Sequence, residues 1–490
     1  MHRRDQWSVR RIASLWCAVT LFPQPNQTRT RCSSLRFPFV SISERRSQLN
    51  IRPLRSDQRH RRGLTVRKVA VQRRVSFGNP LLLFKLLLNA DYVRLWSIGV
   101  SLNIVFWLET VALGIYVYEL TQSAFAVGFI GFLRLVPLLL LGAFIGTIAD
   151  RVNRRVMLAT TNFTSAIIYL VLGVLVVTGR IELWHVSAGA FIGGVLWATD
   201  FPVRRAMIGD SLPPDRLPAA FGVDMASGNF ARIFGPLVGG VFIQAIGMQG
   251  VYFLGAAMFT MASLIALSML FTKTGRNETA AIDETGNGRT YDLRSGLRHV
   301  RTDAILLVTI IVTVVMNIFA FPYQLMIPVI GTDKLHVDPV LVGLLFSVEG
   351  VGATLGALVV AAMAQPRHFT RVFTYSSVGL LALLMAFALV PWYWLAIPLL
   401  FVSGFAMSGF ATMQSVIVVI STSPAMRGRV LGVLTVAIGS GPIGALFVGF
   451  LGTQFGADKA VFIIAAIGLA LTTATVLSSQ RYLRSIPRSP

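Results

Sequence analysis

Several charged side chains lie inside long apolar runs of the sequence. A charge at the centre of a bilayer costs about 2.5–3.5 kcal/mol, so such residues face protein, water or one another. A buried carboxylate can take up and release a proton, and an arginine on another helix can be its counter-ion. The alternative for each carboxylate is a purely structural ion pair. The candidate proton-coupling residues are therefore Glu109, Glu349, Arg232 and Arg134.

Two pairings are expected among the intramembrane charges. Glu349 is expected to pair with Arg134 or with Arg232, and it could also be a second protonatable site. Asp200 and Arg204 stand one turn apart in one predicted helix, a spacing at which opposite charges meet. A structural role is favoured for this second pair.

Apolar segments of membrane-spanning length recur from about residue 93 to residue 480. The 490-residue chain is 54% hydrophobic and 13% charged, whereas a soluble domain carries about 25% charged residues. The sequence predicts an all-α membrane protein with twelve transmembrane helices in two pseudo-symmetric six-helix bundles. These helices are expected near 93–118, 126–148, 157–178, 186–209, 220–246, 250–271, 304–330, 339–364, 369–390, 394–420, 428–452 and 458–480.

The domain organisation follows from the polar stretches between these helices. Residues 1–88 hold seventeen arginines against three acids and so carry most of the net charge of +23. Such a basic segment is interpreted as a disordered extension, a mis-set translation start or a targeting segment. The predicted divisions are 1–88, an N-terminal bundle at 89–271, a cytoplasmic central loop with an amphipathic helix at 272–303, a C-terminal bundle at 304–480 and a cytoplasmic tail at 481–490.

Positive charge is concentrated in alternate loops, which predicts the orientation in the membrane. Lysine and arginine favour the cytoplasmic side, and this rule places both termini there. The basic amphipathic stretch at 292–301 is expected to lie on anionic lipid just before the seventh helix.

The two halves of the body resemble repeats. Gly128 in the second helix and Gly343 in the eighth each follow a valine, and six residues later come the charges Arg134 and Glu349. Related halves imply a central cavity between them and alternating access by rocking of one half against the other.

The fifth helix carries a glycine–proline motif. Arg232, Pro236 and Gly240 follow at intervals of four and share one face, which Gly235 and Gly239 widen with a groove of small residues. Pro236 removes a backbone donor and permits a bend.

Gly352 and Gly356 in the eighth helix are expected to offer the partner groove for this motif. Ordinary small-residue packing is the alternative explanation of the motif.

The loop after the second helix carries a charged signature. It reads G-x-x-x-D-R-x-x-R-R and consists of Gly146, Asp150, Arg151, Arg154 and Arg155. It resembles the signature of the major facilitator superfamily at this position, and the fifth-helix motif resembles that of its antiporter branch. The chain is similar to the twelve-helix drug exporters related to the enterobactin exporter and the macrolide efflux proteins.

This resemblance implies roles for both motifs. Asp150 and its neighbouring arginines would latch the second helix to the inner end of the eleventh, where Arg427 and Arg429 stand. The fifth-helix motif would form a tight contact with the other half that limits leak.

A polar stripe in the seventh helix predicts a cavity wall. Its threonines, asparagine and glutamine fall within about 80° of one another on a helix. Hydrogen bonding between helices is the alternative, at about 0.6 kcal/mol per pair. The substrate-cavity candidates are Asn317, Gln324, Thr313, Tyr323 and Gln414.

These features predict a secondary active transporter rather than an enzyme, with no cofactor or metal. The hypothesis is a proton-coupled antiporter that exports small amphipathic compounds of drug, macrolide or siderophore type. Alternatives are a narrow-range metabolite or siderophore exporter and a non-transporting membrane sensor or scaffold. The expected partners are a small-molecule substrate, protons and the bilayer, with no nucleic acid and a monomeric chain. The expected location is the bacterial cytoplasmic membrane, or an organellar envelope if residues 1–88 are a transit peptide.

Overall fold

The structure is a computed structural model, and it describes residues 86–149, 152–213, 215–270, 293–363, 365–424 and 426–479. The chain divides into two units, residues 1–74 and 75–490, and every described residue belongs to the second. The basic extension through residue 85, Asp150, Arg151 and the tail at 481–490 therefore lie outside the described residues. Within the described part, every regular element is a helix.

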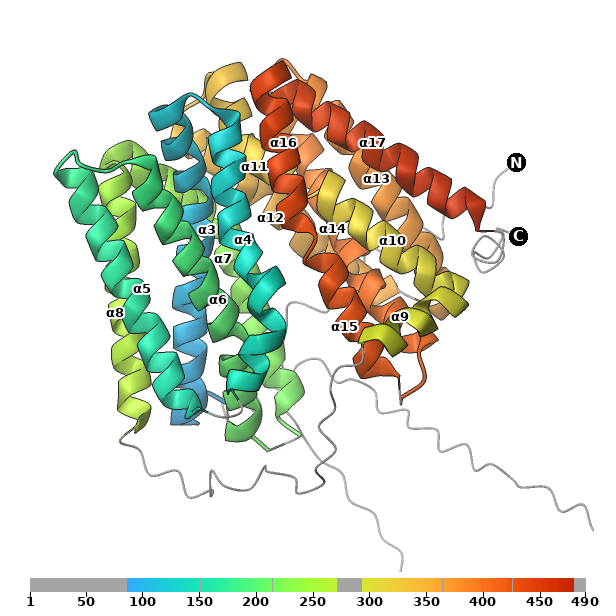
Figure 1. The fold of residues 1–490 in the computed structure, drawn as a ribbon, viewed down its shortest axis with the longest axis horizontal. Helices are drawn as coiled ribbons and strands as arrows, with labels where there is room; N and C mark the ends of the chain where they lie inside the picture. Colours follow the sequence, from blue (N-terminus) through green and yellow to red (C-terminus); the bar gives the residue numbers. More distant parts are fainter. Residues whose placement is uncertain are drawn as a thin grey trace, which may run out of the picture. The chain divides into compact units, whose positions relative to one another are not determined.

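The first half of the body is a bundle of six long helices joined by short turns (Figure 1). Polar side chains fix two of the helix starts: Asn89 accepts a hydrogen bond from the backbone of Tyr92, and Asn153 accepts one from Arg155. The helices are α3 (Ala90–Thr121), α4 (Ala124–Ala149), α5 (Arg154–Val177), α6 (Leu183–Ser211), α7 (Leu217–Ala245) and α8 (Met248–Leu270).

The second half contains the other six predicted crossings, and two of them are interrupted. One breaks at Ala320–Pro322 and the other at Gly439–Ser440, just before the Gly441–Pro442 pair, because proline supplies no backbone donor. The segments are α9 (Leu293–Thr302), α10 (Ala304–Phe319), α11 (Tyr323–Val329), η1 (Ile330–Lys334), α12 (Pro339–Met363), η2 (Pro366–His368), α13 (Phe369–Leu389), α14 (Tyr393–Ser421), α15 (Arg427–Ile438), α16 (Gly441–Phe455) and α17 (Ala457–Ser478).

The described helices are long enough to span a membrane at the positions where the sequence predicts crossings. Ten segments are long and apolar enough to cross a bilayer, and Ala124–Leu140 is a shorter apolar helix. The remaining predicted crossing is α7, which carries the charged residues Asp224 and Arg232. The predicted fold class is thereby confirmed, with helix ends within a few residues of those expected.

The predicted amphipathic helix before the seventh crossing forms as α9. Its apolar side packs against α15 and α10, where Val300 is fully buried beside Leu306 and Val430. Gly296 lies against the backbone carbonyl of Arg429. Part of the apolar face is therefore covered by protein at Val300, while Leu297 is 41% exposed.

Two helix pairs form the largest contacts between the halves, α4 with α16 and α7 with α12, and α11 also contacts α3 and α4. In each pair a glycine lets two backbones touch. Gly128 lies against the carbonyl of Ala445 and the backbone of Gly449, and Gly343 lies against the carbonyl of Pro236. The two glycines that the repeat pattern aligns thus have the same role in related crossings.

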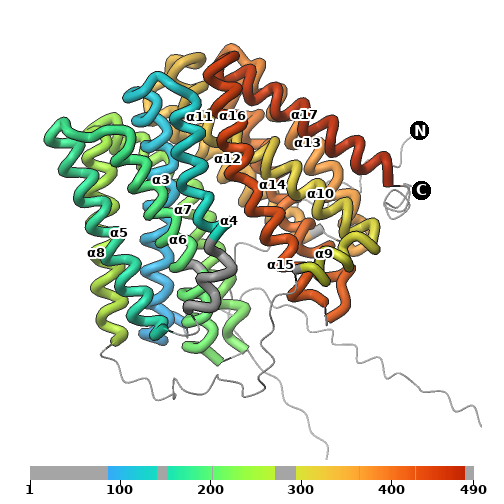
Figure 2. The backbone as a smooth tube through the Cα atoms, in the orientation of Figure 1, coloured from blue at the N-terminus to red at the C-terminus, as the bar shows by residue number. Residues whose placement is uncertain are grey.

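These contacts between the halves cluster where α4 begins and α16 ends, which we call the α4–α16 end (Figure 2). There the backbone amide of Phe125 donates to Thr453 Oγ1 at 3.0 Å. Toward the opposite end, α15 packs on α9, α10 and α14 within its own half. The first half of α7 likewise packs on its own bundle, where Tyr92 donates to the Ala220 carbonyl at 3.1 Å.

One predicted contact is wrong. A side chain at Gly352 or Gly356 would meet the backbone of α14, at Phe401 and Phe405 respectively, and not α7. The glycines of α12 meet two different neighbours. Gly352 and Gly356 lie against α14, whereas Gly343 and Gly350 lie against α7.

Candidate functional site

Glu109 on α3 and Arg134 on α4 form a buried ion pair inside the N-terminal bundle. Glu109 Oε2 lies 3.1 Å from Arg134 Nη2, and both side chains are mostly buried. Arg134 also donates to Thr110 Oγ1 and to the Phe106 carbonyl, each at 3.2 Å. Its guanidinium carbon stands 4.3 Å from the centre of the Phe106 ring. Three contacts of the Arg134 guanidinium thus go to neighbours on α3.

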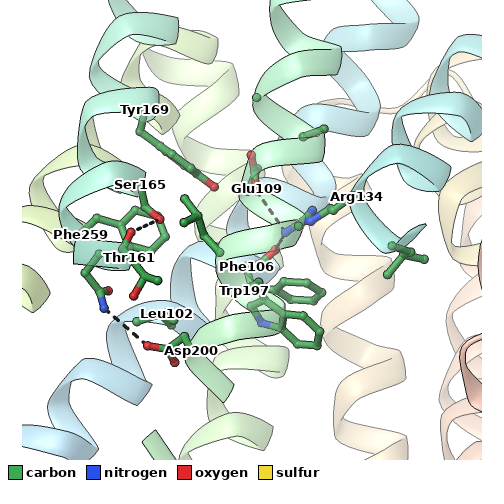
Figure 3. A pocket seen from close by; sticks show the side chains of 17 residues that line it. Leu102, Phe106, Glu109, Arg134, Thr161, Ser165, Tyr169, Trp197, Asp200 and Phe259 are labelled. Atoms are coloured by element: carbon green, nitrogen blue, oxygen red, sulfur yellow. Dashed lines mark hydrogen bonds and ion pairs between the residues drawn. The ribbon is translucent and has the colours of Figure 1, made fainter. Parts of the chain in front are cut away.

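This pair lines a cavity of about 50 Å³ between α3, α4, α5, α6 and α8. Figure 3 shows Glu109 and Arg134 on one side of the cavity and Asp200 on the other. Phe106 and Trp197 stack at 5.4 Å between ring centres. The aromatic lining is Phe106, Trp197, Tyr169 and Phe259.

A second group of buried charges lies behind the Asp200 side of the cavity. Arg204 Nε donates to Asp200 Oδ2 at 3.3 Å, which confirms the pairing that the spacing predicts. Arg204 Nη1 also donates to Asp224 Oδ1 on α7 at 2.7 Å. Arg205 Nε is 4.0 Å from Asp224 Oδ2.

Asp224 was missed by sequence reasoning. It precedes the apolar part of α7 and resembles a residue at the membrane surface, yet only 7% of its side chain is exposed. The signal that could have found it is the excess of arginine on α6. Arg204 and Arg205 are adjacent, and Asp200 can balance only one of them.

Arg232 on α7 and Glu349 on α12 form an ion pair between the two halves. Arg232 Nη2 donates to Glu349 Oε1 at 2.9 Å, and only 1% of the Glu349 side chain is exposed. Gln324 on α11 donates to both carboxylate oxygens, at 3.0 and 3.3 Å. Of the two partners expected for Glu349, the structure shows Arg232. It also brings the predicted cavity residue Gln324 to the same carboxylate.

The glycine–proline motif of α7 contacts two different helices. Gly240 lies against the backbone of Pro339 and the Pro236 carbonyl lies against Gly343, so this face meets α12 as its spacing predicts. Gly235 and Gly239 instead lie against α3, at Trp107 and Leu108 of the same bundle. The motif therefore seats α7 between its own half and the other.

The remaining residues of the predicted substrate cavity are buried, and Thr313 bonds across to Gln414 on α14. Thr313 donates to Gln414 Oε1 at 3.2 Å, and Asn317 donates to the Thr313 carbonyl at 2.9 Å. Tyr323 is fully buried on α11. None of the five candidates lines the cavity in the N-terminal bundle.

Two residues of the loop signature are described with their side chains, and both contact their own bundle. Arg154 pairs with Asp210 on α6 at 2.8 Å. Arg155 donates to the Met269 carbonyl on α8 at 2.7 Å. Gly146 lies within α4. Arg427 donates to carbonyls of Val419 and Thr422 beside its own helix start. The expected latch to the eleventh helix depends on Asp150, which lies outside the described residues.

Curated relatives of the chain include multidrug efflux pumps and a siderophore transporter. The staphyloferrin A transporter of Staphylococcus aureus is 22% identical over 371 residues, which cover 75% of this chain and 90% of the relative. The multidrug efflux pump Tap of Mycolicibacterium fortuitum is 25% identical over 332 residues, covering 66% and 79% respectively.

Solved transporter structures share the fold. A bacterial homolog of the human lysosomal transporter Spinster has a TM-score of 0.64 at 14% identity and covers 84% of this chain and 100% of its own. The nucleoside transporter NupG has a TM-score of 0.65 at 15% identity, with coverages of 81% and 100%. The model of the transmembrane secretion effector family matches residues 85–486. The chain therefore belongs to this family of major facilitator transporters, and it is a multi-pass membrane transporter rather than an enzyme.

Proposed function

We propose that the protein is a proton-coupled antiporter that exports small amphipathic compounds from a bacterial cytoplasm. Both termini would face the cytoplasm, as the distribution of arginine indicates. The observation that carries the proposal is the pair of buried carboxylates, Glu109 and Glu349, each bonded to an arginine of another helix.

Proton coupling is supported by the chemistry of these pairs. An ionised carboxylate is stable at this depth only while its arginine stays close, so separation of the two favours protonation. Protonation of Glu349 would weaken its bond to Arg232 and with it the link between the halves. Proton uptake would in this way be tied to movement of one bundle against the other.

Alternating access is supported by the uneven contacts between the halves. The halves touch near the α4–α16 end, where Phe125 bonds to Thr453, and pack separately toward the α9 end. In the proposed orientation the α9 end faces the cytoplasm. This arrangement would admit substrate from inside and release it after the contacts at the α4–α16 end open.

A narrow-range siderophore exporter is the second candidate. The 22% identity to the staphyloferrin A transporter over most of both chains favours it. A membrane sensor or scaffold on the same fold is a third candidate, and it predicts no flux.

The test is transport by the purified full chain in proteoliposomes. Ethidium movement is measured with and without an imposed pH gradient, and again after a protonophore is added. Gradient-dependent flux that is lost in Glu109→Gln and Glu349→Gln supports the proposal. Glu119→Gln is the matched control, because Glu119 lies on the same helix as Glu109 but is exposed. Flux that does not depend on the pH gradient would exclude proton coupling. Absence of flux for every tested compound would favour the sensor.

A further inference from the structure

α9 carries three arginines on its exposed face. Arg294, Arg298 and Arg301 are all exposed, and at 100° per residue they fall within about 60° of one another on the helix. Gly296 and Val300 lie on the opposite face, where Gly296 meets the backbone of α15 and Val300 is fully buried. One side of α9 is thus fixed on α15 and α10, and its basic side faces outward.

No carboxylate among the described residues balances this basic face. The three guanidinium groups form no ion pair or hydrogen bond within the described part of the chain. Asp303 is the nearest described acid in the sequence, and it accepts hydrogen bonds from the backbone amides of Ile305 and Leu306 at the start of α10. The sequence of the C-terminal half then contains no acid between Glu349 and Asp458.

At the same end of the molecule, the N-terminal half pairs basic residues with acids. Arg94 pairs with Asp91 at 3.3 Å, and Arg154 pairs with Asp210 at 2.8 Å. The preference of arginine for the cytoplasmic side acts on both halves. It therefore explains why arginines are present in α9 but not why these arginines lack acidic partners. An anionic partner from outside the chain accounts for the difference.

The position of α9 indicates what this partner is. A membrane-spanning segment begins at Ala304, directly after α9, and another begins at Arg427 in α15, on which α9 packs. α9 therefore lies at the depth of the lipid headgroups. Leu297, beside the arginines, is 41% exposed, which suits an interface with an apolar layer below the headgroups. Guanidinium groups bind phosphate through paired, charge-assisted hydrogen bonds.

We propose that the exposed face of α9 binds the phosphate groups of anionic phospholipids in the cytoplasmic leaflet. Arg294, Arg298 and Arg301 bind the headgroups, and Leu297 contacts the lipid below them. The bound lipid holds α9, and with it α15, at the membrane surface. This surface is separate from the proposed transport function, because it involves neither the substrate nor the proton-coupling residues.

The experiment measures binding of fluorescently labelled phosphatidylglycerol to the full chain in a neutral detergent. Phosphatidylcholine with the same label and acyl chains is the reference, because it carries a phosphate but no net charge. Each basic residue near an anionic headgroup contributes about fivefold to binding, so phosphatidylglycerol should bind at least about tenfold more tightly at low salt. Added sodium chloride should reduce this difference.

Two pairs of substitutions localise the binding. Arg294→Gln/Arg298→Gln should weaken binding of phosphatidylglycerol at least about tenfold. Arg180→Gln/Lys459→Gln removes two exposed charges from loops at the α4–α16 end and should change it by less than about twofold. Leu297→Gln keeps every charge and should weaken binding by about threefold, since it removes an apolar contact with the lipid. Unfolding midpoints equal to that of wild type confirm that each variant is folded.

Equal affinity for the two lipids, or unchanged binding by Arg294→Gln/Arg298→Gln, would overturn the proposed surface. Competition by inorganic phosphate at the same concentration as the lipid would show a site for free anions and would reject lipid as the partner. Stronger binding after Glu278→Gln, Asp283→Asn and Glu284→Gln would show that acids of the chain itself occupy the surface, which would also reject lipid. Because binding needs no proton gradient, failure of proton-coupled transport would leave these results intact.

Discussion

Arg232 is bonded to a carboxylate of the opposite bundle that has 1% of its side chain exposed. Removing only the arginine leaves this charge buried and unpaired, which typically costs about 3–5 kcal/mol. Removing both charges avoids that cost. Glu349→Gln still offers a carbonyl oxygen to Gln324, which donates to the native carboxylate.

We expect Arg232→Met to lower the stability of the protein by about 3–5 kcal/mol, and the added Glu349→Gln to restore most of it. Thermal and denaturant unfolding in detergent measure both effects. If the single and double variants are equally stable, the buried charge is not the source of the loss. Transport should be absent in both variants, because neither retains a protonatable Glu349 opposite an arginine.

The charges around Arg204 permit a comparison between a buried and an exposed pair. Asp224 is 7% exposed and bonds to Arg204 at 2.7 Å, whereas Asp210 is 72% exposed and bonds to Arg154 at 2.8 Å. The distances are nearly equal, so burial decides the difference.

We expect Asp224→Ala to destabilise the protein by about 3–5 kcal/mol and Asp210→Ala by less than about 1 kcal/mol. The shift in unfolding midpoint, measured for both variants in one detergent, tests this. Similar shifts would mean that Asp224 contributes no more than a surface charge.

At the scale of elements, glycines determine how closely helices of the two halves approach. Gly343 lies against the carbonyl of Pro236, so even a methyl group there would meet a backbone that cannot move aside. Gly379 on α13 has no described atom within 4 Å of its added carbon. Both residues lie within helices, so the intrinsic helix preference of alanine acts equally at each.

We expect Gly379→Ala to stabilise the protein by up to about 1 kcal/mol, since alanine is the better helix former. Gly343→Ala should lower stability and reduce transport, because it separates α7 from α12 where Arg232 reaches Glu349. Unfolding midpoints and proteoliposome flux measure the pair of variants. If Gly343→Ala changes neither stability nor transport, the α7–α12 crossing can move apart to accept a methyl group.

Periodicity explains which of these contacts could be predicted from the sequence. Apolar runs and turn residues predict all twelve crossings, and the spacing of Arg232, Pro236 and Gly240 predicts the face of α7 that meets α12. The partners of Gly352 and Gly356 could not be predicted, since a small residue indicates that another helix approaches closely but does not indicate which helix. The same limit applies to Thr313 and Gln414, whose hydrogen bond depends on how α10 and α14 are placed.

The cavity in the N-terminal bundle shows the limit of sequence reasoning for the site. Its residues come from five helices, and most are aromatic or small side chains that are common in any membrane helix. Glu109 and Arg134 could be singled out because a charge in an apolar run is rare. Asn162, which also lines the cavity, gives no such signal, because the lack of a partner at its Oδ1 atom is a property of the packed structure.

At the scale of the whole molecule, the contacts near the α4–α16 end make a test of alternating access possible. Phe125 and Thr453 belong to opposite halves, and the 3.0 Å bond between them places positions 125 and 453 close together. The chain contains only Cys17 and Cys32, both before the helical body, so introduced cysteines would be the only thiols there once these two are replaced by serine. Gly173 on α5 and Phe253 on α8 are in contact within one half and provide a control pair.

We expect a disulfide between Phe125→Cys and Thr453→Cys to stop transport, and reduction to restore it. The linkage prevents the halves from separating at the end where they touch. A disulfide between Gly173→Cys and Phe253→Cys should leave transport unchanged, because it joins helices that move together. Full transport by the chain linked at 125–453 would show that this end does not open, and rocking of the two bundles would then be the wrong mechanism.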